Sequence, residues 1–481
     1  MEAAPGARCS VVRMPTNVVL ICADQWRADC LSVAGHPDVF TPNLDQLAGR
    51  GVRAERAYSA TPTCVPARMA LMTGLKPSSH RRVGYIDGVE FDIETTLPQC
   101  LREAGYQTQA IGKMHYWPER GRIGFDDVML HDGYLHHSRD RSRPVEAYDD
   151  YVPWLRDQAG ADAAADIIDD GLSCNAITAR PWTQPERLHP TNWVATQAER
   201  WLYRRDPTTP FFLYLSFHRP HAPLDPPAWA FDRYARRDLA PPVRGEWTSR
   251  LDPWRDNTNP EALVADYRDD VVHEARAGYY GSISHVDAQI GRILMMLGEF
   301  GLADDTVVAF VSDHGDMMGD HGMWRKGYPY EGSSRVPFLL TGPGLPRGVV
   351  LHDLVELRDV MPTLLEAVGV PVPDEVEGRS VLALLNGETG RAHLHGEHTI
   401  LGQSLQWIVT DQHKYVWWSD DGHEQLFDLE CDPHEERDVA SENPDVVHRC
   451  RGLLIAELAG RPYVRDGDLV PGQPASPLLP R

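Results

Sequence analysis

Three apolar runs, each long enough for one strand, constrain the fold of this chain more than any other feature. They occupy residues 17–26 (NVVLICADQW), 209–221 (TPFFLYLSFHRPH) and 305–316 (DTVVAFVSDHGD), and each ends in polar side chains. A run without apolar–polar alternation is typical of a strand with both faces buried, as in a parallel sheet. We therefore expect a sheet that other elements cover on both sides.

Helical patterns lie between these runs. Residues 41–51 carry a capped helix pattern that ends at glycine, and residues 274–302 form a long amphipathic pattern that leads into the strand at 306. Residues 95–112 predict a helix and then a strand, and residues 358–370 predict a further helix. This alternation predicts an α/β fold in which helices sandwich a large mixed, mostly parallel β-sheet.

The alternation lapses in two places. The regular pattern is absent from residues 131–200, of which 148–171 are acidic and irregular, and this predicts an insertion and a candidate lid. From residue 391, short strand-like pieces and a helix near 444–459 predict a small antiparallel sheet-and-helix subdomain. We expect a flexible N-terminal segment at 1–14, a main domain at 15–390 and a C-terminal subdomain at 391–481, whose Pro-rich end is either an exchanged arm or a disordered tail.

The charge balance limits the partners of the chain. Its 47 lysines and arginines face 70 aspartates and glutamates, which gives a net charge of −23. We therefore expect no nucleic acid and no membrane among its partners, and an anionic ligand would need a local island of positive charge. No apolar stretch of about 18 residues occurs, and the start of the chain lacks a signal-peptide core. The eight cysteines are scattered, as in a reducing compartment, so we expect a cytoplasmic protein, with homo-oligomer formation left open.

Polar side chains at two strand ends suggest a metal site. Asp24 and Gln25 end the first apolar run, and Asp313 and His314 end the third. In open parallel sheets ligands gather at the carboxyl edge of the strands, where these four side chains would emerge. Two carboxylates, an amide oxygen and an imidazole suit one hard or borderline divalent cation. The alternative is that Asp24 and Asp313 only cap the turns that follow them.

The stretch TCVPARMALMTG (63–74) contains an unpaired cysteine, Cys64, at the start of a helical pattern. An unpaired cysteine is commonly a small buried hydrophobe. A helix start favours anions and polarised oxygens, and Arg68 lies one helical turn away on the same side. A Cys64 thiolate could act as a nucleophile, but it matches a hard, oxygen-preferring metal poorly.

The motif CVPAR resembles the C-x-P-S-R signature of the type I sulfatases of the alkaline phosphatase superfamily, in which the cysteine is oxidised to formylglycine. Further motifs resemble the family in the same order from residue 18 to about 440, so the likeness covers nearly the whole chain. These motifs are ADQWR, TPNLDQLA, IGKMH, RPHAPLDPP, SDHGDMMGDHGMWRKG and LFDLECDPHEERDVA.

The resemblance implies a sulfate monoester hydrolase with an alkaline phosphatase-like fold. Cys64 would become formylglycine through a formylglycine-generating enzyme, and its hydrate would attack sulfur to form a hemisulfate intermediate. The cation would be held by Asp24, Gln25, Cys64, Asp313 and His314. The resemblance further assigns Arg68 to orient the formylglycine, Lys113 and Lys326 to neutralise sulfate oxygens, His221 to protonate the departing alcohol, and His115 to take a proton from the intermediate.

Three positions depart from the family pattern. Ala67 stands at the position where serine is the commonest residue of the signature, and this exchange affects how efficiently the maturation enzyme converts Cys64. Gln25 and His314 stand where many members carry aspartate and asparagine. These exchanges lower the ligand charge and make manganese as suitable as calcium, and both more suitable than magnesium.

Two other functions stay open. A phosphonate monoester hydrolase or phosphodiesterase of the same superfamily would use a similar site for its tetrahedral anion. In the phosphonate hydrolase branch, the positions of Lys113 and His115 resemble uncharged tyrosine and threonine, so this chain favours a sulfate monoester, with an aryl, carbohydrate or alkyl alcohol. The second alternative is a non-catalytic metal-binding homologue. His218 lies in the same strand end as His221 and is a weaker candidate for the same role.

Overall fold

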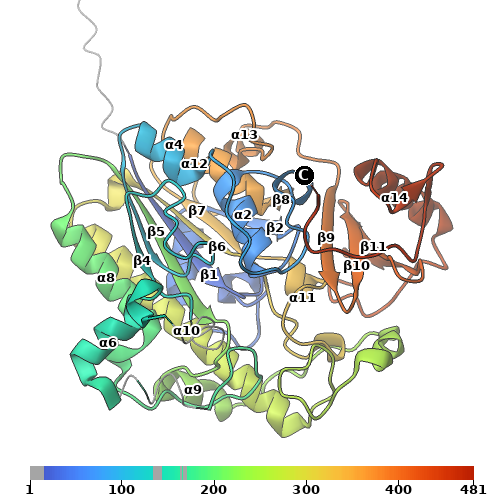
Figure 1. The fold of residues 1–481 in the computed structure, drawn as a ribbon, viewed down its shortest axis with the longest axis horizontal. Helices are drawn as coiled ribbons and strands as arrows, with labels where there is room; N and C mark the ends of the chain where they lie inside the picture. Colours follow the sequence, from blue (N-terminus) through green and yellow to red (C-terminus); the bar gives the residue numbers. More distant parts are fainter. Residues whose placement is uncertain (1–15, 134–142, 163–164, 166–170, 481) are drawn as a thin grey trace, which may run out of the picture.

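The computed structural model describes residues 16–133, 143–162, 165 and 171–480. The segment expected to be flexible, 1–14, lies outside the described residues. An eight-stranded sheet forms the centre of the molecule, in the order β4-β3-β5-β1-β6-β7-β2-β8 (Figure 1). All its strand pairs are parallel except those of β7. The strands are β1 (Asn17–Asp24), β2 (Val52–Tyr58), β3 (Gln107–Gly112), β4 (Asp127–Leu130), β5 (Phe211–Pro220), β6 (Thr306–Ser312), β7 (Phe338–Thr341) and β8 (Val349–Glu356).

The three apolar runs form β5, β1 and β6, which are direct neighbours in the middle of the sheet. Every residue of these strands is buried. Successive side chains of a strand point to opposite faces, and in β1 Val19 and Ile21 enter one hydrophobic core while Val18 and Leu20 enter another. The mostly parallel sheet with two covered faces is therefore confirmed.

Helices cover both faces of the sheet (Figure 1). The face of Val19 packs against α1, α8 and α10, and the face of Val18 packs against α2, α4 and α12. None of the described helices is both long and apolar enough to cross a lipid bilayer. The helices are α1 (Pro42–Gly49), α2 (Cys64–Thr73), α3 (Pro77–His80), α4 (Leu97–Glu103), α6 (Tyr151–Ala159), α8 (Pro190–Arg204), α9 (Ala228–Ala235), α10 (Asp269–Glu299), α11 (Glu331–Ser334), α12 (Val360–Ala367), α13 (Val381–Leu385) and α14 (Pro444–Glu457).

Two predicted boundaries differ in the structure. The long helix α10 begins at Asp269 rather than at 274, because its first turn is acidic and stabilises the helix N-terminus. The irregular segment 131–200 gives way before its end to the regular helix α8. Pro190 occupies the first turn of α8, where a proline is well accommodated, and the His189 ring accepts a hydrogen bond from the backbone N–H of Thr191.

A second, four-stranded sheet follows in the order β12-β11-β10-β9, with antiparallel pairs throughout. Three of its strands match the predicted pieces, and β9 is an additional strand. Helix α14 packs on one face, and the other face contacts the main body through a separate apolar cluster. The strands are β9 (Leu394–Ile400), β10 (Gln403–Val409), β11 (His413–Trp418) and β12 (Glu424–Asp428), and a short hairpin follows from β13 (Val464–Arg465) and β14 (Asp468–Leu469).

The Pro-rich end of the chain returns to the main body (Figure 1). The backbone N–H of Val83 donates to Pro477 O at 2.9 Å, and that of Leu479 donates to Arg81 O at 2.9 Å. An exchanged arm and a disordered tail were the two expectations for this end. The described residues of the tail instead pair with their own chain.

Candidate active site

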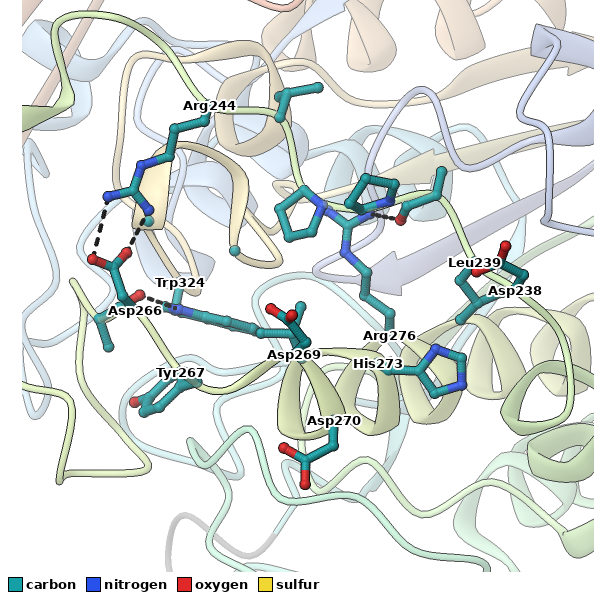
Figure 2. A pocket seen from close by; sticks show the side chains of 18 residues that line it. Asp238, Leu239, Arg244, Asp266, Tyr267, Asp269, Asp270, His273, Arg276 and Trp324 are labelled. Atoms are coloured by element: carbon teal, nitrogen blue, oxygen red, sulfur yellow. Dashed lines mark hydrogen bonds and ion pairs between the residues drawn. The ribbon is translucent and has the colours of Figure 1, made fainter.

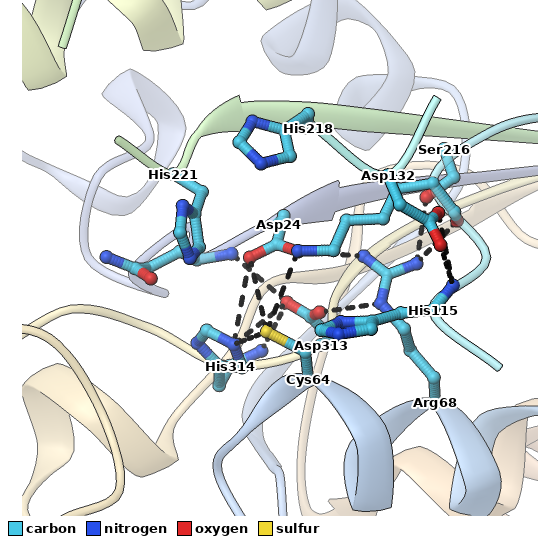
Figure 3. A network of polar contacts seen from close by, with 12 residues as sticks. Asp24, Cys64, Arg68, His115, Asp132, Ser216, His218, His221, Asp313 and His314 are labelled. Carbon is cyan, nitrogen blue, oxygen red and sulfur yellow. Dashed lines mark hydrogen bonds and ion pairs between the residues drawn. The ribbon is translucent and has the colours of Figure 1, made fainter. Parts of the chain in front are cut away.

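The two strand ends that carry aspartate meet as predicted. The register of β1 and β6 places Ala23 opposite Ser312, so Asp24 and Asp313 follow at the same level of the sheet. Ligand atoms of four buried side chains then lie within 4.8 Å of one another: those of Asp24, Cys64, Asp313 and His314 (Figure 3). A set of two carboxylates, an imidazole and a sulfur fits one divalent cation, with the oxygens suited to a hard ion and the nitrogen to a borderline one.

Cys64 is the first residue of α2 and is only 2% exposed. Its Sγ lies 3.2 Å from His314 Nε2, 3.7 Å from Lys113 Nζ and 3.8 Å from Asp24 Oδ1. Burial and Asp24 raise the pKa of the Cys64 thiol. The cations of Lys113 and Lys326 outweigh them, so the net pKa is well below the ordinary value of a thiol.

Arg68 forms ion pairs with both carboxylates of the cluster. Its Nε lies 2.9 Å from Asp313 Oδ2, and its NH2 group lies 3.1 Å from Asp24 Oδ2. Lys113 Nζ approaches Asp24 Oδ2 at 2.5 Å. Burial raises the pKa of Asp24, but Lys113 reverses this effect and brings that pKa well below its ordinary value, whereas burial and the neighbouring Asp24 raise the pKa of Asp313. Two buried cations thus hold the carboxylates in fixed positions.

Lys326 occupies the opposite side of the cluster. Its Nζ donates to Gln25 Oε1 at 2.6 Å and to His221 Nε2 at 2.6 Å. The amide of Gln25 also donates to Asp316, so this side chain is engaged with two charged partners. Since a lysine ammonium can only donate, Nε2 of His221 accepts, and Nδ1 carries the proton that is shared with Ala222 O at 2.9 Å. Burial and Lys326 hold the pKa of His221 well below its ordinary value.

His115 lies at the end of β3 in a left-handed conformation, with φ of 58°. The carboxylate of Asp132 accepts the backbone N–H groups of Met114 at 2.7 Å and of His115 at 3.1 Å, which holds this unfavourable turn. Among the described residues, neither ring nitrogen of His115 has a hydrogen-bond partner, and Nε2 lies 3.6 Å from Asp87 Oδ1. Burial lowers the pKa of His115, but Asp87 and Cys64 raise it by a larger amount, so the net shift of this pKa is upward.

Sequence reasoning missed several residues that position the cluster. Asp132 follows the short strand β4, the parallel neighbour of β3, and recognising that strand would have placed it near the turn after β3 that carries His115. Tyr214 and Ser216 face Arg68 from β5, and their hydroxyl oxygens accept from its NH1 group at 3.1 and 2.9 Å. Their two-residue spacing in a buried strand was the available signal, because alternate residues share a face.

Three further polar candidates lie outside the ligand cluster. The ring of His218 lies beside that of His221, with centroids 4.9 Å apart, and its Nδ1 accepts from Arg219 at 2.6 Å. Asp320 pairs with Arg27 and Arg276 at 2.7 Å each. His321 accepts the backbone N–H of Gly245 at 3.0 Å. Asp320 and His321 are therefore engaged in contacts between neighbouring loops and α10.

Two hollows differ in their relation to this cluster. A cavity of about 750 Å³ is lined by Trp324, Arg276 and acidic side chains near the start of α10, and it contains none of the predicted site residues (Figure 2). A smaller hollow of about 220 Å³ is lined by Val65, the neighbour of Cys64, and by His115. The smaller one is therefore the relevant opening, because it adjoins the reactive side chains.

Comparison with known families identifies the chain by two matches. The family model described as Sulfatase matches residues 16–370. A second model, described as N-sulphoglucosamine sulphohydrolase, C-terminal, matches residues 319–450. Together they span the main sheet and most of the C-terminal sheet.

Individual proteins agree with this result. An arylsulfatase of Clostridium perfringens is 45% identical over 479 residues, which cover 97% of this chain and 99% of the relative. A choline-sulfatase of Rhizobium meliloti is 31% identical, with 89% of this chain and 83% of the relative covered. Among solved structures, a phosphonate monoester hydrolase of Agrobacterium radiobacter superposes with a TM-score of 0.76 at 28% identity, with coverage of 95% and 100%.

Proposed function

Because this chain belongs to the sulfatase family and is a sulfuric ester hydrolase of the arylsulfatase type, we propose that it cleaves a sulfate monoester of an aryl, carbohydrate or alkyl alcohol through a formylglycine at position 64. The products are the alcohol or phenol and inorganic sulfate. The observation that carries the proposal is the position of Cys64, at the first turn of α2 and within 4.8 Å of two carboxylates and an imidazole. Conversion requires a formylglycine-generating enzyme as a partner, and the hydrate then offers an oxygen nucleophile in place of sulfur.

The proposed cation is held by Asp24, Asp313 and His314, with Gln25 and residue 64 completing its ligands. Carboxylate and amide oxygens favour calcium, and the imidazole nitrogen makes manganese equally suitable. When bound, the cation polarises the oxygen atoms around it as a Lewis acid. Arg68 contributes by fixing the orientation of both carboxylates through its Nε and NH2 groups.

Lys113 and Lys326 supply the positive charge for the sulfate group. Their Nζ atoms lie on opposite sides of the cluster, against Asp24 and against Gln25. As the sulfate oxygens gain charge in the transition state, both ammonium groups can donate to them. A chain with a net charge of −23 can thereby bind an anion at one place.

His221 is the proposed donor to the departing oxygen. In the substrate-free arrangement Lys326 donates to its Nε2 and keeps the ring neutral. A sulfate group that draws the ammonium away would free Nε2 and remove the adjacent positive charge, which favours protonation of His221.

His115 is the proposed base for the return of residue 64 to its resting state. A base needs an accepting nitrogen within reach of the proton that it removes, and neither ring nitrogen of His115 hydrogen-bonds to the part of the chain that the structure describes. Asp132 and the backbone turn hold the ring beside Cys64.

A phosphonate monoester hydrolase is the second candidate, because a structure of that activity superposes over the full chain. Two observations favour the sulfate ester. The relative at 45% identity is an arylsulfatase, and Lys113 adds an ammonium group to the cluster, 2.5 Å from Asp24 Oδ2.

One paired experiment separates these candidates. Mass spectrometry of the peptide that contains Cys64 should give the mass of formylglycine or its hydrate after expression with the maturation enzyme. The same preparation should hydrolyse 4-nitrophenyl sulfate faster than 4-nitrophenyl phenylphosphonate, and a chelator should abolish both activities. Preference for the phosphonate would assign the protein to the second candidate, and an unmodified thiol with no turnover would contradict both.

A further inference from the structure

We propose that Asp225 is a positioning residue for proton transfer to the departing alcohol, and that it acts through two intervening side chains, Arg219 and His218. These side chains hold the ring of His221, the proposed proton donor. The inference rests on the role proposed for His221 and adds the residues that keep this imidazole in place. All four side chains are buried, and Figure 3 shows the rings of His218 and His221 side by side.

The contacts run in sequence from Asp225 to the donor. Both oxygens of the Asp225 carboxylate accept from Arg219, Oδ1 from Nε at 2.7 Å and Oδ2 from the NH2 group at 2.9 Å. The NH1 group of the same guanidinium donates to Nδ1 of His218 at 2.6 Å. The ring of His218 packs against that of His221, with the two planes inclined at 54°. Because a bidentate pair with a carboxylate fixes the orientation of a guanidinium, Asp225 also fixes the ring that accepts from it.

The His218 ring is also confined at its other nitrogen. A guanidinium can only donate, so Nδ1 of His218 accepts and the proton of the neutral ring lies on Nε2. This nitrogen lies against Gly133, where a Cβ atom would come within 2.2 Å of it. Close neighbours at both nitrogens leave the ring little freedom to rotate, so its contact with His221 is well defined.

The Asp225 carboxylate also lies close to the start of helix α8. Nε2 of His189 lies 3.7 Å from Asp225 Oδ1, and Nδ1 of His189 accepts the backbone N–H of Thr191 in the first turn of α8. The contacts that support the donor therefore extend from the end of β5 to the start of α8. Two regular elements fix the outer end of this series, and His221 lies at its inner end.

In the proposed reaction His221 loses one of its own restraints. Lys326 donates to its Nε2 in the substrate-free arrangement, and a sulfate group would draw this ammonium away. The remaining hydrogen bond of the ring, from Nδ1 to Ala222 O, restrains a single atom. Packing against His218 persists, because Asp225 holds that ring independently of the substrate. A displacement of about 1 Å can slow a reaction by about 10²-fold, so this support matters when the proton is delivered.

A series of phenyl sulfates of similar shape tests the inference. 4-Nitrophenyl, 4-chlorophenyl and 4-methylphenyl sulfate release increasingly basic phenols, so their need for a proton rises in that order. In Asp225→Asn, kcat/KM should fall about 10–100-fold for the 4-methylphenyl ester and less than about threefold for the 4-nitrophenyl ester. In a His221→Ala background the same substitution should not change the ratio of these two values further, because residues that act through one another are not additive.

A matched control separates positioning from stability. Asp359→Asn breaks another buried bidentate pair, in which Arg391 donates to both carboxylate oxygens at 2.6 Å, in the turn before α12. Both substitutions should lower the melting temperature, but Asp359→Asn should leave the ratio of kcat/KM for the two esters unchanged. His218→Ala removes the last contact before the donor and should reproduce the changed ratio, and it serves if Asp225→Asn does not fold.

The outcomes separate this inference from the role on which it rests. An unchanged ester ratio in folded Asp225→Asn or in His218→Ala, with a changed ratio in His221→Ala, overturns the inference and leaves the proposed reaction intact. An effect of Asp225→Asn that is equally large in the His221→Ala background also overturns it. An unchanged ratio in His221→Ala overturns the role of His221 and the inference together. No turnover of any sulfate ester by protein that carries formylglycine overturns the proposed function itself.

Discussion

Two buried charge clusters in this molecule look alike in composition and differ in how their charges are paired. The active-site cluster surrounds Cys64. The second, here called the junction cluster, consists of Lys414, Glu331, Glu435 and Arg335, between the main body and the C-terminal sheet. In both, a lysine with no exposed side-chain surface contacts carboxylates.

The charged groups of the junction cluster are paired with one another, and the cluster is called closed for this reason. Lys414 Nζ lies 2.8 Å from a carboxylate oxygen of Glu331 and 2.8 Å from one of Glu435, and the other oxygen of Glu435 accepts the backbone N–H of Glu331. The active-site cluster is open, because the ring nitrogens of His115 have no hydrogen-bond partner within residues 16–133, 143–162, 165 and 171–480, and a hollow reaches its edge. Removing one partner from a buried ion pair destabilises a fold, whereas buried donors and acceptors without partners are available to a ligand.

The first prediction tests the open cluster. Cys64→Ala should reduce sulfate ester hydrolysis on the order of 10⁴-fold or more, because it removes the side chain that becomes the nucleophile. The melting temperature should not fall, since no charged pair loses a partner. Initial rates with 4-nitrophenyl sulfate and a thermal melt measure the two effects. Retained activity would remove Cys64 from the mechanism.

The second prediction tests the closed cluster. Lys414→Met should lower the free energy of unfolding by about 3–5 kcal/mol, because it leaves two carboxylates buried without their cation. The kcat of the protein that remains folded should not change. Denaturant unfolding measures the loss, and adding Glu435→Gln to the same variant should recover part of it. A large drop in kcat with an unchanged free energy of unfolding would show that the junction cluster serves catalysis and not stability, which contradicts this comparison.

The third prediction sharpens the role of His221 within the open cluster. His221→Ala should slow alkyl sulfates by about 10²–10⁴-fold and activated aryl sulfates much less, because only a poor leaving group needs a proton. A plot of log kcat/KM against the pKa of the leaving alcohol should therefore become steeper in the variant. Equal losses for all esters would assign proton donation to another residue, with His218 the nearest imidazole.

The fourth prediction uses the pH dependence of the closed cluster. Burial raises the pKa of Glu435 from 4.5 to about 7, although Lys414 lowers it. A carboxyl with a raised pKa in the folded state contributes stability below its unfolded pKa and loses it as pH rises through the folded value. Glu435→Gln should therefore gain about 1–3 kcal/mol relative to the wild type between pH 4 and pH 8. Unfolding curves at both pH values give the difference, and parallel profiles would contradict the raised pKa.

Much of the fold followed from local patterns in the sequence. The three unbroken apolar runs predicted buried parallel strands, and they are β5, β1 and β6. Less regular elements escaped: β4 has four residues, β9 carries the polar residues His395, Glu397 and His398, and α8 begins at a proline. Such elements are stabilised by the surfaces on which they pack more than by their own residues, so their sequence signal is weak.

The sequence by itself determined which chemical groups stand at the strand ends and at the first turn of α2. Residues a few positions apart are enough to identify a strand end or a helix start. Because parallel strands end at the same edge of a sheet, the side chains at those positions lie at that edge. Only the tertiary structure decided how the groups are paired. Gln25 turns to Lys326 and Asp316, Asp132 holds the turn at His115, and the tail lies on residues 81–83. These contacts join residues that are far apart in the chain, and their partners are set by strand register and side-chain packing, which local sequence patterns do not encode.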